Sequence, residues 1–524
     1  MTVSLPVDSE NNEIEGTQDD SMLVLEDALK ICKFGWFHLR LLLASLCGML
    51  ATIMMTTTSS FILPIAECDL DMDNMMKGWL NAIPFLGQIG ASVFIGFLVD
   101  TFGRRIFLLS GHFGVFLCGL LEGSSQTYWM LIVVKFLQGI AMTISYTAIS
   151  TMLSEFIHKE IRDRILLLLG SFMSLSLIVV ALMSWAILPQ TQLYFVIWKG
   201  YFELHSWNIY LYVCSLWSLF AFLLYYSLPE SPKFLLSEGR DKEALEVLKT
   251  MYRVNTGKDK DDFPIKTLQR GKLHEPKEKL GIKKQIVRSL FEVKDSFDKR
   301  NIYNLVLISS MTFVCLSTYT CLRLWYPQIS TIIEHYHKDH GEFGQFCNMI
   351  NWKNSVKPQI ESNTTCVPQV SGTETYVNAI ILGVTSLIFS GASGFVVQCL
   401  GHRLLMFLIQ ISCAAASSGL YFTSSSIEIA LLISVTCALV QTSSILQGNI
   451  LVRVFPTKLR ALAFSIVMIV GRTGSLLGNV LFPVLLEMGC MAPFLTLSIA
   501  CLCQASVVYF LPDPNKQNKG TGDK

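Results

Sequence analysis

Twelve long apolar runs constrain the fold of this chain more than any other feature. Each run is about twenty residues long and is bounded by charged residues or by Pro and Gly, which is the length that a helix needs to cross a bilayer. A polar stretch separates the first six runs from the last six. The composition agrees, because 52% of the 524 residues are hydrophobic and only 15% are charged. The sequence therefore predicts an all-α integral membrane protein with twelve transmembrane helices in two six-helix bundles.

The runs also predict how the chain is divided. The expected spans are 40–64, 78–98, 106–124, 129–153, 166–188, 208–228, 304–325, 377–398, 404–424, 427–451, 462–486 and 493–511. The expected regions are an N-terminal tail (1–36), a first bundle (37–228), a linker with a short helix (229–303), a second bundle (304–511) that includes an extracytoplasmic loop (330–376), and a C-terminal tail (512–524). Basic residues gather in alternate connections, as at Arg104, Arg162 and Arg460, so both termini are expected in the cytoplasm.

A short polar motif occurs once in each half with the same spacing, which indicates a duplication. Both copies follow the second apolar run of their half. The first copy contains Gly96, Asp100, Gly103, Arg104 and Arg105, and the second contains Gly394, Gln398, Gly401, His402 and Arg403. Glycines let two helix ends approach closely, and the charges of the first copy can pair with a neighbouring helix at the cytoplasmic surface. We expect this motif to act as a latch that holds one conformation closed.

The two longest polar connections carry different signals. Residues 238–248 in the linker have helical spacing, which fits either a helix lying on the membrane surface or a solvated linker helix. The loop between the seventh and eighth spans contains an N-glycosylation sequon at Asn363. Its only cysteines are Cys347 and Cys366, and we expect these two to form a disulfide in an oxidising compartment.

These motifs resemble the major facilitator superfamily over almost the whole chain. The resemblance rests on the paired Gly-rich loops, on Pro229-Glu230-Ser231-Pro232 after the sixth span, and on the segments that follow the fourth and tenth spans. Stretches such as Phe61-Ile62-Leu63-Pro64, His205-Ser206-Trp207 and Leu324-Trp325-Tyr326-Pro327 are similar to the branch that contains the synaptic vesicle glycoproteins 2. The resemblance implies a central cavity between two bundles that opens alternately to each side. It also implies that Glu155 and Arg162 join the cytoplasmic latch.

Two cations inside predicted spans are candidates for the substrate cavity. Lys135 lies in the fourth span and Arg472 in the eleventh, and a charge in hydrocarbon normally faces a cavity or a partner. Either cation can bind an anionic group of a solute or pair with a carboxylate at a gate. For Lys135 the alternative is a side chain that reaches back to the membrane interface.

Polar and aromatic side chains complete the list of cavity candidates. Gln441, Gln447, Asn449 and Asn479 place amides along the tenth and eleventh spans, where they either line the cavity or hold helices together. Trp325 and Tyr326, at the end of the seventh span, either close the outer mouth of the cavity or belong to the interfacial aromatic belt.

The predicted spans lack carboxylates in their interiors, and this sets the expectation for whether transport is coupled to protons. The acidic pair that the vesicle branch carries in the first span aligns with Thr52 and Met55, which cannot take a proton. Glu122 and Glu487 lie near span ends and are expected at the interface. Proton-coupled transport generally needs an intramembrane carboxylate that titrates. The sequence therefore favours uniport or exchange over proton symport.

The function expected from the sequence is alternating-access transport of a small organic solute across a plasma or vesicle membrane. The competing hypothesis is a glycoprotein that has lost transport and acts through protein partners, and Thr52, Met55, Gln398 and Arg453 are the residues that favour it. The sequence contains no nucleotide-binding loop, no zinc-type Cys/His spacing and no catalytic serine motif, so we expect neither an enzyme nor a bound cofactor or metal, and no nucleic-acid partner.

Overall fold

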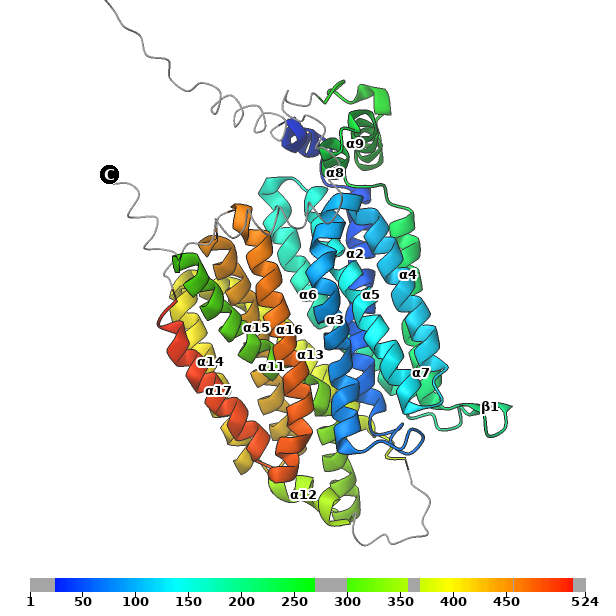
Figure 1. Ribbon diagram of the computed structural model, residues 1–524, viewed down its shortest axis with the longest axis vertical. Helices are drawn as coiled ribbons and strands as arrows, with labels where there is room; N and C mark the ends of the chain where they lie inside the picture. Colours follow the sequence, from blue (N-terminus) through cyan, green and yellow to red (C-terminus); the bar gives the residue numbers. More distant parts are fainter. Residues whose placement is uncertain (1–23, 269–298, 357–367, 456, 512–524) are drawn as a thin grey trace, which may run out of the picture.

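The computed structural model describes residues 24–268, 299–356, 368–455 and 457–511, in which twelve long helices run roughly parallel to one axis (Figure 1). Their bounds are α2 (Trp36–Ile62), α3 (Asn74–Phe102), α4 (Arg104–Gly123), α5 (Tyr128–Glu155), α6 (Lys159–Ile187), α7 (Ser206–Tyr226), α11 (Lys299–His340), α13 (Thr373–Leu400), α14 (His402–Gly419), α15 (Ser426–Val454), α16 (Thr457–Met488) and α17 (Ala492–Val508). Shorter elements are β1 (Phe195–Trp198), β2 (Phe202–Leu204), α8 (Pro232–Ser237), α9 (Asp241–Thr256), η1 (Lys260–Asp262), α12 (Phe346–Val356) and η3 (Leu420–Phe422). The long helices agree with the expected spans in number and order.

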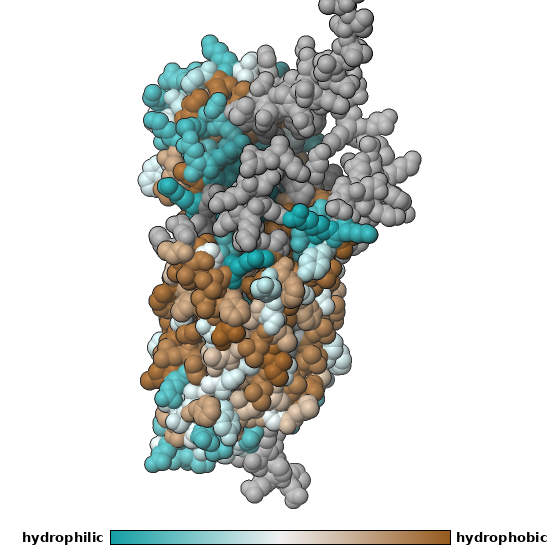
Figure 2. Space-filling view, turned by 90° about the vertical axis from the view of Figure 1, so that its left-hand side faces the viewer, coloured by the Kyte–Doolittle hydropathy of each residue, from teal (hydrophilic) through white to brown (hydrophobic). Residues whose placement is uncertain are grey.

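The surface of the long helices is suited to lipid. Ten helices within the described residues are long and apolar enough to cross a membrane, and α17 is a shorter apolar helix of 17 residues. Figure 2 shows a broad hydrophobic band between two hydrophilic ends. We call the end of the bundle at which α9 lies the α9 end and the opposite end, at which α12 lies, the α12 end (Figure 1).

The helices form two groups that follow chain order. Helices α2 to α7 pack mainly against one another, as do α11 to α17, and the two groups lie side by side in Figure 1. The groups meet where α3 packs on α16, where α6 packs on α13, and where α2 approaches α11. The contact between the two groups is therefore formed by six helices, namely α2, α3, α6, α11, α13 and α16.

The duplicated motif has the same backbone geometry in both halves. Gly103 precedes α4 with φ 100° and ψ 156°, and Gly401 precedes α14 with φ 75° and ψ 164°. A positive φ of this kind favours glycine, which explains its presence at both sites. Two positions after each glycine stands an arginine that makes the same contact in both halves. Arg105 donates to Tyr226 O at 2.8 Å and Arg403 donates to Tyr509 O at 3.4 Å, each at the end of the last helix of its half.

Glycines allow the closest helix contacts inside the first half. A β-carbon at Gly139 of α5 would overlap the carbonyl oxygen of Pro84 in α3, and one at Gly87 would overlap the carbonyl oxygen of Phe136. Small residues at such crossings let backbones approach, which drives helix association in lipid.

Replacing Gly139 with alanine should therefore destabilise the protein. We expect Gly139→Ala to cost about 1 to 3 kcal/mol, the usual range for overpacking a close contact. The control is Gly170→Ala in α6, where a β-carbon meets no atom within 4 Å and helix propensity predicts a gain of about 0.5 to 1 kcal/mol. Denaturant unfolding of the purified variants measures both, and equal stabilities would show that the α3–α5 contact is not tight.

Among the described residues, a small module formed by the helical segment that begins at residue 24 and by α8 and α9 covers the α9 end of the first half. Leu25 and Leu29 of the preceding helical segment pack on Leu248 and Met251 of α9 in one hydrophobic cluster. Glu26 binds Arg162 of α6 at 2.7 Å. The apolar face of α9 is thus buried against protein, so neither a membrane-surface helix nor a solvated linker describes it.

One residue of α9 ties this module to the start of α2. The Asn255 side chain donates to Cys32 O at 3.0 Å and accepts from the Phe37 amide at 2.9 Å. Burial in the same contact raises the pKa of the Cys32 thiol to about 12, so this thiol is uncharged and packs as a small hydrophobic group.

The α12 end departs from the expected spans in two places. Helix α11 continues through Pro327 to His340, far beyond the expected end of its span, because Ile329, Ile332 and Ile333 pack in the core of the second half. Between α6 and α7 the strands β1 and β2 form an antiparallel hairpin that sequence patterning did not predict. All four residues of β1 are exposed, so no buried face gave it an alternating pattern.

Candidate functional site

A small pocket lies between the two halves. The first half contributes residues of α2 and α6, and the second half contributes residues of α11 and α13. The lining residues are Thr57, Phe61, Leu177, Arg323, Tyr326, Pro327, Ala379 and Leu382. The walls are mostly apolar with few polar groups, which is typical of small-molecule sites.

The halves are in close contact between this pocket and the α12 end. Phe61 of α2 stacks on Tyr376 of α13 with ring centroids 6.2 Å apart. A β-carbon at Gly78 of α3 would lie 3.0 Å from the Pro483 ring of α16, and one at Gly383 of α13 would lie 2.6 Å from Ile178 of α6.

Toward the α9 end the same helices leave open space. A β-carbon at Gly170 of α6 or at Gly391 of α13 would meet no atom within 4 Å. The close contact of α6 with α13 at Gly383 therefore has no counterpart at Gly170 or Gly391.

Arg323 is the charged residue of the pocket. Its side chain is buried, with 6% of the residue exposed, and its guanidinium donates to the Thr57 hydroxyl at 2.9 Å and lies over the Tyr319 ring. Its Nε has no hydrogen-bond partner, and no carboxylate pairs with it among the described residues. A buried cation without a counter-charge is costly, so this guanidinium is suited to bind an anion.

Lys135 lies inside the first half and not in this pocket. Its ammonium is completely buried and forms an ion pair with Glu122 of α4 at 3.0 Å. It also donates to Thr58 Oγ1 at 3.0 Å, Met55 O at 3.1 Å and Gln138 Oε1 at 3.3 Å. Lys135 therefore joins α2, α4 and α5 in one polar cluster, and it does not reach back to the interface.

The expectation that Glu122 is interfacial is wrong. Glu122 does lie near the end of α4, but its side chain points inward and is completely buried. The reason is the facing Lys135, because an ion pair offsets part of the cost of removing both charges from water. The interior of the helix bundle thus contains a carboxylate, which removes the argument for uniport or exchange that rested on its absence.

Arg472 does lie between the two halves. It is largely buried in α16, and its guanidinium contacts the Gln88 carbonyl at 3.4 Å and the Ser92 hydroxyl, both in α3. These contacts are at the middle of both helices. Arg472 holds the halves together in this conformation and is not among the residues that line the pocket.

The amide candidates divide into two kinds. Gln441 of α15 reaches Ser174 of α6 at 3.5 Å and so spans the two halves. Gln447 accepts from Thr312 at 3.0 Å, and Asn479 donates to Ser475 O at 2.8 Å, both within the second half. Asn449 is exposed. Of these amides only Gln441 bridges the halves, so most of them hold helices together.

The two aromatic candidates also separate. Tyr326 lines the pocket, whereas Trp325 faces away from it and packs on Phe482 of α16 with ring centroids 5.1 Å apart. Both residues are 2% exposed, so neither belongs to an interfacial belt.

The expected latch is present in part. Arg104 forms an ion pair with Glu155 of α5 at 3.2 Å, and both side chains are largely buried. Gly96 and Asp100 lie in α3, and the Asp100 side chain is outside what the structure describes. The second-half counterpart is different, since Arg453 is exposed and the position of Arg104 is taken by His402.

Arg162 is not part of this ion pair, because its guanidinium binds Glu26 of the α9-end module. Sequence reasoning missed Glu230, whose carboxylate accepts from the backbone amides of Arg104 at 3.2 Å and Arg105 at 3.1 Å. A carboxylate at the first turn of α4 is favoured by the helix dipole. The Pro-Glu-Ser-Pro stretch was the signal that could have identified it.

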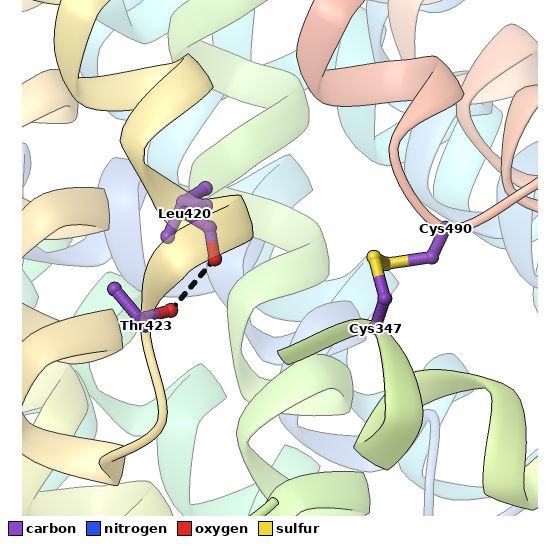
Figure 3. Close-up of a disulfide and its surroundings, with 4 residues drawn as sticks. All are labelled: Cys347, Leu420, Thr423 and Cys490. Atoms are coloured by element: carbon purple, nitrogen blue, oxygen red, sulfur yellow. Dashed lines mark hydrogen bonds between the residues drawn. A yellow bond between two sulfur atoms is a disulfide. The ribbon is translucent and has the colours of Figure 1, made fainter. Parts of the chain in front are cut away.

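The predicted disulfide partner of Cys347 is wrong. Cys347 of α12 is bonded to Cys490, between α16 and α17 (Figure 3). Next to it the Phe346 amide donates to Thr423 O at 3.0 Å, so α12 is fixed to two loops of the second half. Cys366 and the sequon at Asn363 lie outside the described residues. Among the described residues no group of three His, Cys, Asp or Glu side chains could hold a metal ion.

Family models match both halves of the chain. The model described as "Sugar (and other) transporter" matches residues 42–327, more than half of the sequence. The model described as "Major Facilitator Superfamily" matches residues 329–524.

Curated relatives include synaptic vesicle glycoprotein 2A of Homo sapiens, 30% identical over 230 residues, or 44% of this chain and 31% of that protein. Synaptic vesicle glycoprotein 2C of Mus musculus is 30% identical over 250 residues, or 46% of this chain and 34% of that protein. The matched part is thus about a third of the length of these relatives.

Solved structures show the same fold. The partially occluded inward-open structure of the xylose transporter XylE from E. coli matches with a TM-score of 0.63 and 14% identity, covering 91% of this chain and 98% of that one. A crystal structure described as a D-xylose-proton symporter matches with a TM-score of 0.62 over the same shares. The twelve-helix membrane fold expected from the sequence is confirmed, and the chain belongs to the sugar (and other) transporter family within the major facilitator superfamily.

Proposed function

We propose that this protein transports a small organic anion by alternating access at the pocket between its halves. The observation that carries this proposal is Arg323, a buried guanidinium in the pocket wall with no carboxylate partner among the described residues. The planar guanidinium can bind a carboxylate with two parallel hydrogen bonds. The apolar walls formed by Phe61, Leu177 and Leu382 suit the hydrocarbon part of such a solute.

The contacts between the halves support a conformation closed at the α12 end and open toward the α9 end. If the basic loops and the module of α9 are cytoplasmic, as the positive-inside rule indicates, this conformation faces the cytoplasm. Transport to the other side requires Phe61 and Tyr376 to separate and the α9-end halves of α6 and α13 to meet. Arg104 and Glu155 stay within one half and stiffen it during this movement.

Uptake into proteoliposomes tests the proposal. We expect saturable uptake of labelled benzoate or another small carboxylate and no comparable uptake of xylose or of a quaternary ammonium ion. Arg323→Gln should raise the KM for the anion about 10- to 100-fold, the loss expected when a charge-assisted hydrogen bond is removed. Arg240→Gln is the matched control, because Arg240 is exposed on the α9-end module and pairs with Glu243 at 2.6 Å.

The possible results separate the solute classes and the competing function. Uptake of a neutral sugar that is unaffected by Arg323→Gln would contradict the anion assignment while leaving transport intact. Absence of uptake across anions, cations, sugars and nucleotides would contradict transport and favour a membrane glycoprotein that acts through partners. The relatives named above are consistent with either result, since their names state no transported solute.

A further inference from the structure

Two neighbouring threonines of α2 each bind a buried cation. The Thr57 hydroxyl donates to Ile53 O at 2.7 Å and accepts from Arg323 of the pocket. The Thr58 hydroxyl donates to Met55 O at 3.0 Å and accepts from Lys135 of the ion pair. Successive side chains of a helix point in different directions, so the two cations lie on different sides of α2. The pocket and the Glu122–Lys135 pair are therefore separated by a single helix.

Within the described part of the chain, Lys135 alone balances the charge of Glu122. Lys135 of α5 pairs with it, and the other titratable groups that face it are Cys118 of α4 and Cys214 of α7. Helix α2 joins the cluster through Met55 and Thr58, which accept from Lys135 and have side chains that do not titrate. The Glu122 Oε1 atom is buried and has no hydrogen-bond partner. The carboxylate is thus not held by a network that requires it to be ionised.

Lys135 remains satisfied when Glu122 is neutral. An ammonium group has three N–H donors. Three uncharged acceptors already surround Lys135 Nζ in addition to Glu122, namely Met55 O, Thr58 Oγ1 and Gln138 Oε1. Protonation of Glu122 therefore leaves the lysine with a complete set of hydrogen bonds.

We infer that Glu122 is the proton-binding site of a proton–anion symport mechanism, coupled across α2 to the anion at Arg323. This inference rests on the proposed function. With Glu122 ionised, the charges of Arg323, Lys135 and Glu122 sum to one positive charge, and with Glu122 protonated they sum to two. Coulomb attraction for an anion in the pocket is stronger in the second case. By thermodynamic reciprocity, a bound anion strengthens proton binding by the same factor.

The proton and the charge balance over one cycle. A proton from water adds to the Glu122 carboxylate on one side of the membrane and forms a carboxylic acid, while the anion binds at Arg323. No covalent bond of the solute forms or breaks. After the halves rock, the anion and the proton both leave to water on the other side, and the Glu122–Lys135 ion pair forms again. For a monocarboxylate, the translocated charge is zero.

Calorimetry of the purified full-length protein with benzoate tests the coupling. Titrations in two buffers of different ionisation enthalpy give the number of protons taken up per benzoate bound. We expect measurable uptake in the wild type at neutral pH and none in Glu122→Gln. The variant imitates the protonated state, so it should bind benzoate about tenfold more tightly in alkaline buffer, within the usual range of coupling factors. Its affinity should not change with pH.

The matched control is Glu487→Gln, since Glu487 is exposed near the end of α16 and should leave proton uptake unchanged. If Glu122→Gln does not fold, Glu122→Gln/Lys135→Gln removes both buried charges and should likewise show no proton uptake. Absence of proton uptake in the wild type, or wild-type pH dependence in the Glu122 variants, would overturn the inference.

Infrared difference spectra between alkaline and acidic buffer separate this inference from the proposed function, because they need no solute. We expect a protonated-carboxyl band that disappears in Glu122→Gln and persists in Arg323→Gln. Such a band in a protein that binds no benzoate would support the proton site and contradict the solute class. If no band depends on Glu122, the proton site is wrong whether or not benzoate binds.

Discussion

Lys135→Ala should destabilise the protein by about 3 to 5 kcal/mol, the usual cost of removing one partner of a buried ion pair. The variant leaves the completely buried Glu122 carboxylate without its counter-charge. Protonation of Glu122 removes that charge, so the loss should become smaller as the pH falls. Unfolding in detergent can be followed with a thiol-reactive dye, since most of the described free cysteines are buried in the native protein.

The double variant Glu122→Gln/Lys135→Gln provides the comparison. It keeps two polar side chains that can hydrogen-bond to each other and has no charge to desolvate, so it should lose clearly less stability than Lys135→Ala. Equal losses in the single and double variants would mean that packing around position 135, and not the ion pair, determines the stability of this cluster.

Removing the disulfide between Cys347 and Cys490 should cost about 2 to 5 kcal/mol, toward the upper end because long loops gain most from closure. The two cysteines are 143 residues apart in the chain. The bond connects α12 to the loop before α17, and we expect Cys490→Ser to loosen α12 while leaving the first half unchanged. Denaturant unfolding of the variant gives the size of the loss.

Peptide mapping without reduction tests the pairing itself. The wild type should yield a peptide pair joined through Cys347 and Cys490, and recovery of Cys347 joined to Cys366 would contradict it. Cys399→Ser is the control for the effect of losing a thiol, because Cys399 is free and exposed at the end of α13.

The sequence predicted the helices and the duplication because both depend on local information. Length and hydropathy alone define a membrane span. The repeated motif is read from spacing, and its glycines at 103 and 401 are needed for a backbone conformation that other residues avoid. These parts of the fold do not depend on which way each helix is turned.

The site could not be predicted to the same degree because it depends on helix rotation. A membrane helix is apolar on all sides, so the sequence does not reveal which face meets the other half. Lys135 and Arg323 look alike in sequence, yet one is paired within a half and the other faces the pocket. Glu122 looked interfacial because only its distance from the span end was known. The partner of Cys347 was missed because Cys490 is distant in sequence and lies outside the loop.

The module at the α9 end makes the two halves unequal as moving bodies. Its described anchors, Glu26 on Arg162 and Asn255 on the start of α2, all belong to the first half. When the halves rock, α9 should move as one rigid body with α2 to α7. Its distance from α14 should therefore change, while its distance from α4 should not. A fluorophore on α9 is therefore a natural reporter of the transport cycle. A second dye on the second half should give a distance signal that changes during transport, and a second dye on the first half should give the constant reference.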